Sequence, residues 1–126
     1  AKEARELDPA LFFQTAEQWA KEIDQHGRDQ QGREKNKSTQ LRRFYDELVR
    51  LNSQAQAKEK EWGMIKPRVH MIVAKAAYAK GRDLVTDKFV SLIRDGITQV
   101  DTREDLQVFT SFFESFMGFY KALRKN

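Results

Sequence analysis

Residues 102–123, TREDLQVFTSFFESFMGFYKAL, contain the clearest helical pattern of the chain. Apolar side chains recur there at alternating spacings of three and four, as on one helix face: Leu106, Phe109, Phe113, Phe116, Tyr120 and Leu123. Thr102 and Asp105 have the spacing of a capping box, with Asp in place of the commoner Glu. The stretch therefore predicts a long helix with an aromatic face that begins just after Thr102.

Four further segments have apolar residues at helical spacing and are expected helices: about residues 9–26, 40–58, 67–81 and 86–100. Asp8 before Pro9, and Thr86 before the fourth segment, are start signals. Gly27 and Gly81 are stop signals. No segment alternates with the period of two that a half-buried strand shows. The sequence predicts an all-α fold, a small bundle of about five helices, in a single domain over residues 1–126.

Two polar stretches interrupt these helices. Residues 28–37, RDQQGREKNK, contain no apolar side chain, so we interpret them as a flexible surface connector that buries nothing. Residues 54–61 are polar all round, and we expect this end of the second helix to fray or protrude. Trp62-Gly63 breaks the pattern. Pro67 then marks the start of the third helix or a kink in a longer one.

Composition narrows the class of protein. The 126 residues are 33% charged with a net charge of +4 and a mean hydropathy of -0.76, while nine Phe supply mass for a core. No apolar run reaches the ~20 residues of a membrane span, and no signal-peptide pattern opens the sequence. The absence of Cys is compatible with the reducing cytoplasm, where we expect this protein to be located.

The stretch Ser38-Thr39-Gln40-Leu41-Arg42-Arg43-Phe44-Tyr45 opens the second expected helix. Ser38 or Thr39 is expected to cap it with a side-chain oxygen. Leu41 and Phe44 face the core, so the two arginines project beside the helix N-terminus. Free backbone amides, the positive dipole end and two guanidinium groups suit phosphate.

The basic residues form two clusters, one on each of two expected helices. On the second helix they are Lys37, Arg42, Arg43 and Arg50, and on the third they are Lys66, Arg68, Lys75, Lys80 and Arg82. The simpler interpretation is a solvated, soluble surface. The alternative is a sequence-independent contact with a polyanion, favoured by Lys75 among small residues and by Arg82 directly after Gly81.

The last expected helix carries a second apolar line, Val108, Phe112 and Phe119, beside the first. One interpretation is a central helix that packs on several sides. The other is an exposed aromatic strip that binds a partner or another copy. The remaining Phe and Tyr residues are mostly at core spacing, so we do not interpret them as platforms for stacking bases.

Signals of catalysis are weak. His26 and His70 are the only histidines, and neither has a neighbour at a metal-ligand spacing. A nuclease that pairs the two histidines as acid and base would need them to converge from distant segments. We therefore expect no enzyme activity, no metal and no cofactor.

The motif around Arg42 resembles that of the small helical subunit of type III-A CRISPR (Csm) effector complexes, (S/T)-x-Q-(I/L)-R-(K/R)-F. Pro67 and Ala74-Lys75-Ala76-Ala77-Tyr78-Ala79-Lys80-Gly81-Arg82 resemble a second element of that family, and the aromatic closing helix resembles a third. The resemblance runs from Ser38 to the C-terminus.

This resemblance implies a non-catalytic subunit for antiviral defence that contacts RNA. Copies stack into a minor filament beside the crRNA-binding backbone subunits, with the large polymerase-domain subunit at one end, and hold the target RNA along the guide–target duplex. The implied RNA-binding positions are Lys37, Thr39, Gln40, Arg42, Arg43, Lys75 and Arg82. The alternative is a helical protein–protein adaptor without RNA contact, which would use Val108, Phe112 and Phe119.

Overall fold

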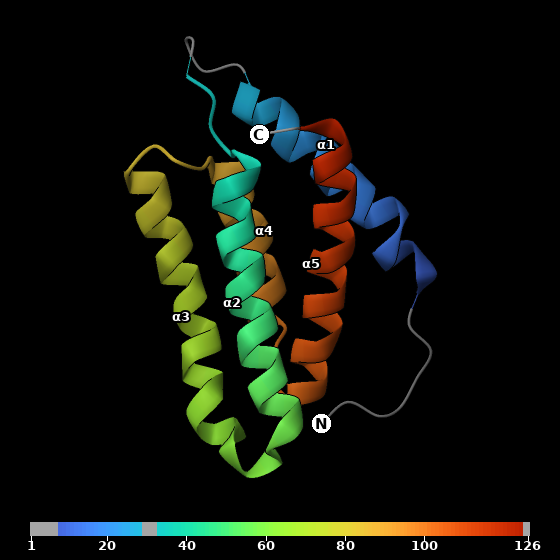
Figure 1. The fold of residues 1–126 in the computed structure, drawn as a ribbon, viewed down its shortest axis with the longest axis vertical. Helices are drawn as coiled ribbons and strands as arrows, with labels where there is room; N and C mark the ends of the chain where they lie inside the picture. Colours follow the sequence, from blue (N-terminus) through green and yellow to red (C-terminus); the bar gives the residue numbers. More distant parts are fainter. Residues whose placement is uncertain (1–7, 29–32, 125–126) are drawn as a thin grey trace.

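The structure, a computed structural model, describes residues 8–28 and 33–124. Its elements in chain order are the 3₁₀ turn η1 (Pro9–Phe12), α1 (Gln14–Arg28), α2 (Ser38–Ala57), the 3₁₀ turn η2 (Glu59–Glu61), α3 (Trp62–Gly81), α4 (Asp87–Thr98) and α5 (Arg103–Leu123). Every regular element among these residues is a helix, so the predicted all-α bundle is confirmed (Figure 1).

Two pairs of helices pack closely, α1 with α5 and α3 with α4, and α2 lies between the pairs and contacts both. α5 packs against α1 and α2, while α3 packs against α4 and α2. Figure 1 shows α2, α3 and α5 running side by side, with α1 crossing α5 obliquely at one edge and α3 lying at the opposite edge. α3 therefore keeps an outward face that no other helix covers in this view.

The predicted apolar faces form one core. Leu41, Leu48 and Leu51 of α2 are fully buried. At the centre, Phe113 of α5 packs edge-on against Phe89 of α4 at 6.3 Å between ring centroids. Full burial of one such side chain contributes about 1.5–3 kcal/mol to the free energy of folding. These aromatic contacts therefore stabilise the packing of α4 against α5.

The start signals are confirmed in three places. The Asp8 side chain accepts a hydrogen bond from the Ala10 amide at the start of η1, and Thr86 is the N-cap residue of α4. At the start of α5, Thr102 Oγ1 accepts from the Asp105 amide at 3.1 Å, and the Asp105 carboxylate accepts from the Thr102 amide at 3.0 Å. The capping box is therefore present, with Asp in the place of Glu.

The start of α3 agrees with one of the two alternatives for Pro67, a longer helix that contains it, and differs from the prediction at Trp62 and Gly63. Trp62 and Gly63 do not interrupt the helix but begin it, and Pro67 lies inside it. The Trp62 indole donates to the Asp101 carbonyl at 3.1 Å, which attaches this end of α3 to the turn before α5. Tertiary contact therefore outweighs the local breaking tendency of Gly63.

The end of α2 does not fray, since the helix continues to Ala57, although residues 56–60 are exposed there. Ala55 is fully buried. The Arg103 guanidinium donates to the carbonyls of Ala55 and Gln56, at 3.2 and 3.1 Å, and the Gln56 amide donates back to the Arg103 carbonyl at 2.8 Å. These bonds satisfy carbonyls at a helix end and hold α2 against the start of α5.

The expectation that residues 28–37 bury nothing is wrong at Asn36; residues 29–32 lie outside the described part. Arg28 belongs to α1. Asn36 is fully buried in a left-handed conformation, with φ of 58°. Its side chain donates to the Ile23 carbonyl at 3.0 Å and accepts from the Thr86 amide at 2.9 Å. A polar residue is buried here because its hydrogen bonds are satisfied.

α1 ends at Arg28, one residue after the predicted stop at Gly27. A Cβ at Gly27 would lie 2.4 Å from the Lys35 carbonyl oxygen. Glycine is needed because the backbone around Lys35 and Asn36 passes directly over α1. The glycine that the sequence suggests as a helix stop therefore also allows two segments of the chain to approach closely.

Gly96 in α4 marks a second close approach and supports a stability test. A Cβ there would lie 2.1 Å from the Phe109 ring, whereas a Cβ at Gly118 of α5 meets nothing within 4 Å. We expect Gly96→Ala to lower the free energy of unfolding by about 1–3 kcal/mol through overpacking. Gly118→Ala, its matched control, should raise it by about 0.5–1 kcal/mol. Urea denaturation measures both, and an unchanged or higher stability of Gly96→Ala would show that the close approach is absent.

Candidate nucleic-acid interface

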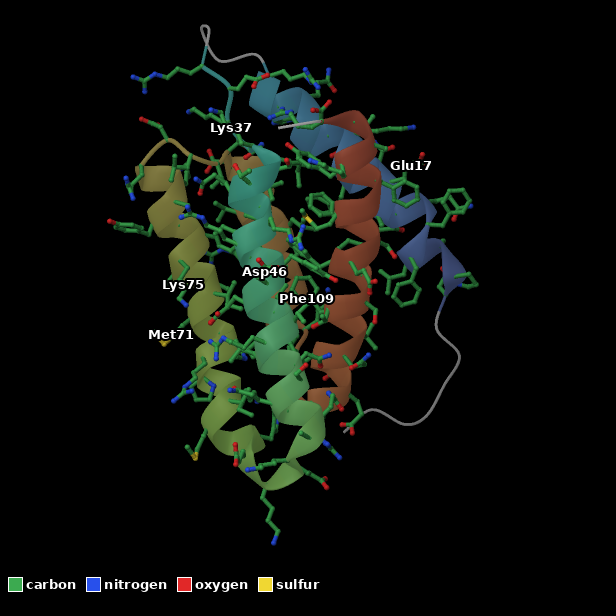
Figure 2. The ribbon with its side chains drawn as sticks, viewed as in Figure 1. Glu17, Lys37, Asp46, Met71, Lys75 and Phe109 are labelled. Carbon is green, nitrogen blue, oxygen red and sulfur yellow. The ribbon has the colours of Figure 1, made fainter. Side chains whose placement is uncertain are left out.

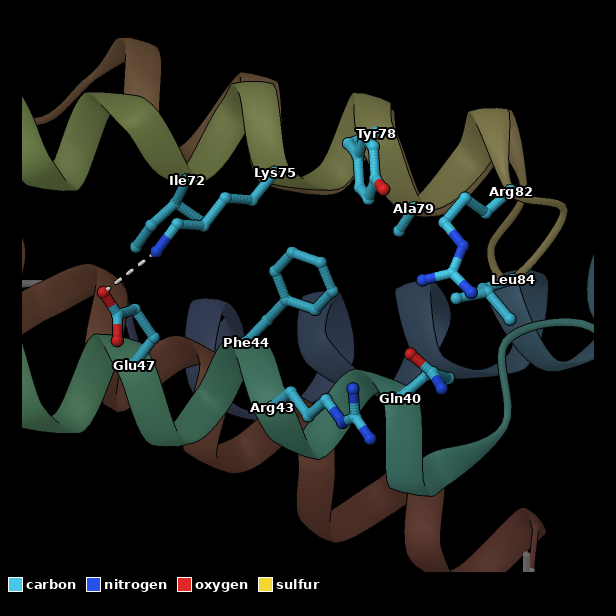
Figure 3. A pocket seen from close by; sticks show the side chains of 10 residues that line it. All are labelled: Gln40, Arg43, Phe44, Glu47, Ile72, Lys75, Tyr78, Ala79, Arg82 and Leu84. Carbon is cyan, nitrogen blue, oxygen red and sulfur yellow. Dashed lines mark hydrogen bonds and ion pairs between the residues drawn. The ribbon is translucent and has the colours of Figure 1, made fainter.

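A groove of roughly 270 Å³ lies between α2 and α3. The residues that line it are Gln40, Arg43, Phe44, Glu47, Ile72, Lys75, Tyr78, Ala79, Arg82 and Leu84. Figure 3 shows the two helices on either side, with side chains from both directed into the space between them. Four of the seven predicted RNA-binding residues are in this set: Gln40, Arg43, Lys75 and Arg82.

Helix geometry explains this convergence. Gln40, Arg43 and Glu47 follow one another at spacings of three and four, so they share one face of α2. Lys75 projects from α3 opposite them, and Arg82 caps the C-terminal end of α3 (Figure 3). Cations from two sequence-distant motifs therefore border a single groove.

The floor of the groove is apolar and rigid. Phe44 is 8% exposed, and Ile72 and Ala79 are buried beside it. The Phe44 ring packs edge-on against Phe89 of the core at 5.1 Å. The charged side chains at the rim therefore stand on a packed base that keeps α2 and α3 at a fixed separation.

One carboxylate lies among the cations. Lys75 Nζ is 3.3 Å from Glu47 Oε2, and Arg50 donates to the same oxygen at 2.8 Å. Burial alone would raise the pKa of Glu47, but the hydrogen bonds from Arg50 and Lys75 outweigh it and lower that pKa. Glu47 is thus ionised at neutral pH and offsets part of the Lys75 charge.

Arg43 and Arg82 are the available cations of the groove. In the described part of the chain neither forms a salt bridge, whereas Lys66 and Lys80 of the same basic clusters are paired with Asp101 and Asp87. A guanidinium without an internal carboxylate partner retains its donors for an external anion.

The other three predicted residues lie outside the groove. Lys37 is the N-cap residue of α2 and forms no side-chain cap. Ser38 and Thr39 are the first two helical residues, so the predicted cap from either one is wrong. Arg42 points away from Arg43 and lies 3.3 Å from Asp46 in an exposed ion pair. Successive helix residues are about 100° apart, so Arg43 lines the groove while Arg42 does not.

The predicted strip on α5 is not one exposed surface. Phe112 is 6% exposed and stacks on Phe109 at 6.2 Å between centroids. Phe119 is half-buried and stacks on Phe13 at 5.9 Å, and Val108 is half-buried as well. These contacts favour the interpretation of α5 as a helix that packs on several sides.

Tyr78 is the groove residue that the sequence interpretation missed. It is 69% exposed at the rim, although most aromatic residues of this chain are in the core. Its position departs from the buried series Ile72, Ala76 and Ala79 on α3, and that departure is a signal in the sequence.

A pair of catalytic histidines finds no support. His26 is exposed on α1 and His70 is exposed on α3, so the two lie on different helices. Among residues 8–28 and 33–124, no group of three or more His, Asp or Glu side chains could hold a metal ion. No helix in the same residues is long and apolar enough to cross a membrane.

Fold and groove together define a small all-helical protein with a basic interhelical groove. Residues 6–126 match the family model Csm2 Type III-A, and the chain therefore belongs to the Csm2 family, the structural small subunit of the type III-A CRISPR complex. Comparison with characterised proteins gave no match, and comparison with solved structures gave none. The family match confirms the resemblance found in the motifs.

Proposed function

We propose that the groove between α2 and α3 holds the phosphate backbone of target RNA along the guide–target duplex, in a type III-A interference complex for antiviral defence. The convergence of Arg43 and Arg82 on one groove carries this proposal. Lys75 and Gln40 complete the rim, with one further positive charge and an amide that donates and accepts hydrogen bonds.

Such contacts fit a subunit that recognises RNA without reading its sequence. In a guided complex base pairing supplies the sequence information, so protein cations need only bind backbone and shape. Copies stacked into a minor filament beside the crRNA-binding backbone subunits would repeat the groove along the duplex. Weak contacts then add through multivalency, and we expect the isolated subunit to bind RNA weakly and with strong salt dependence.

In this proposal the chain performs no catalysis and acts in the cytoplasm, with the large polymerase-domain subunit at one end of the filament. The alternative is a protein–protein adaptor whose groove never contacts RNA. The uncovered face of α3, with Met64 and Met71 exposed, is the observation that favours an adaptor. The two functions are separated by whether groove cations affect RNA affinity.

Arg42 and Arg43 provide a matched pair for this test. We expect Arg43→Gln in the assembled complex to weaken target-RNA binding about tenfold, the effect of one lost charge-assisted contact. Arg42→Gln should change affinity by less than about twofold, because its guanidinium lies outside the groove and exposed ion pairs contribute little. Titration of labelled target RNA measures both. No effect of either variant would favour the adaptor, and equal losses of affinity would show that RNA binding does not depend on the groove.

A further inference from the structure

The outward face of α3 carries three large apolar side chains in a line. Met64, Met71 and Tyr78 are 67%, 58% and 69% exposed and are spaced seven residues apart. Pro67 and Ala74, also exposed, fall between them and complete a three–four spacing. Figure 2 shows Met71 projecting from α3 away from the rest of the bundle. We call these five residues the α3 seam.

The fold does not need this seam. The opposite face of α3 is already buried in the core, through Ile65, Val69, Ile72, Ala76 and Ala79. The described part of the chain has three other exposed large hydrophobic residues, and these lie apart from one another on different segments: Phe13, Val49 and Leu123. A helix that is apolar on two opposite faces usually has a second partner.

The spacing indicates that a helix covers the seam. Apolar residues repeating every seven positions, with another three after each, are typical of a helix that packs lengthwise on a second helix. Met64 to Tyr78 spans about 21 Å at 1.5 Å per residue, which is about four turns of such a partner.

Positively charged side chains beside the seam indicate the charge that a partner helix would carry. Arg68 and Lys75 each follow a seam residue directly and lie seven positions apart. They form one positive edge in which Arg68 carries the larger share of the charge, because Glu47 offsets part of the Lys75 charge. Arg68 has no salt bridge within the described residues, and α3 contains no Asp or Glu. A helix with carboxylates along the facing edge would complement this row.

A second copy of this chain does not fit the seam. Two α3 helices packed against each other would place Arg68 and Lys75 against the same cations, with no carboxylate on either helix to offset them. In the part of the chain that the structure describes, no other helix offers a comparable exposed apolar line.

We propose that the α3 seam binds an amphipathic helix of another protein, whose apolar face is bordered by carboxylates. This interface meets the groove at Tyr78, which borders both, and it goes beyond the proposed RNA contact because Met64 and Met71 lie outside the groove. Within the type III-A complex, it would attach the small subunit to a neighbouring subunit of a different kind.

The test is a photo-reactive residue, p-benzoylphenylalanine, placed at Met71 of the subunit in the assembled type III-A complex. We expect crosslinks to one helical segment of a different subunit that carries Asp or Glu at seven-residue spacing. The same residue at Val49, an exposed apolar position on α2, should give at least tenfold less of that product. Crosslinks mainly to RNA, to a second copy, to a segment without carboxylates, or at yields equal to those of Val49 would overturn the proposal.

Charge reversal separates this interface from the groove. We expect Arg68→Glu to lower the yield of the Met71 crosslink at least fivefold. Replacing a carboxylate of the crosslinked partner segment by Lys, in combination with Arg68→Glu, should restore the yield. Arg94→Glu, at an exposed arginine of α4, should leave the yield unchanged. Arg43→Gln should lower RNA affinity without lowering this yield, so failure of the RNA proposal and failure of the seam proposal give different results. A yield insensitive to Arg68→Glu would contradict the acidic partner.

Discussion

Replacement of Arg124 by Met is expected to lower the free energy of unfolding by about 3 kcal/mol or more, the range for removing one partner of a buried ion pair. Arg124 follows α5 and is 1% exposed. Its Nε donates to the Asp24 carboxylate at 2.9 Å, and its terminal nitrogens donate to the carbonyls of Lys35 and Asp24 at 2.8 and 3.0 Å. Methionine keeps much of the apolar stem but leaves the carbonyls of Lys35 and Asp24 without this donor, while the Asp24 carboxylate retains its hydrogen bond from Arg28.

The loss should extend beyond the last helix because Arg124 joins three segments. The Asn36 carbonyl accepts from Arg124 and from the Tyr120 hydroxyl, and burial raises the pKa of Tyr120, which keeps that hydroxyl protonated as a donor. Asn36 in turn lies two residues before the first residue of α2, so the cluster fixes where the groove helix begins.

Urea denaturation measures this effect, with Arg94→Met as the control at an exposed arginine. The control should change stability by less than about 0.5 kcal/mol. In a thermal melt the Arg124→Met variant should unfold roughly 10 °C earlier. A stability loss no larger than that of the control would show that Arg124 is not a structural anchor.

The helices themselves were predictable because their apolar residues follow a local periodicity. Thr86 and Thr102 marked the starts of α4 and α5, and Leu41 and Leu48 marked the buried face of α2. These are local signals, since a cap and a stripe are each encoded within a few turns.

The predictions that the structure corrects concern residues whose positions depend on contacts between distant segments. Asn36 looks like a surface residue in a polar stretch, yet its partners are Ile23 and Thr86. Gly27 looks like a helix stop, yet it makes room for the backbone at Lys35. Such pairings depend on how helices dock, which no local pattern specifies.

The residue types of the candidate site could be predicted from the sequence, but which of these residues share one groove could not. Sequence indicated cations on the second and third helices, and the structure brings Arg43 and Arg82 to one groove while Arg42 turns away. That selection depends on the rotation of α2 about its axis, which the burial of Phe44 sets. Tyr78 escaped notice because aromatic residues of this chain are mostly in the core.

The largest expected effect on function belongs to the double variant Arg43→Gln/Arg82→Gln. Both guanidinium groups border the groove without an ion pair in the described residues. Each charge-assisted contact contributes about 1.5–3 kcal/mol, so removal of two should weaken target-RNA binding by the assembled complex about a hundredfold or more. Arg42→Gln/Arg94→Gln removes the same charge outside the groove and serves as the control.

The most direct measurement is the affinity of this double variant for target RNA at several salt concentrations. Each lost phosphate contact should reduce the slope of log affinity against log salt by about 0.7, hence by about 1.4 for every copy that holds the RNA. The control should keep the parental slope. If the double variant kept both the parental affinity and the parental slope in a folded, fully assembled complex, the groove would not be the RNA contact.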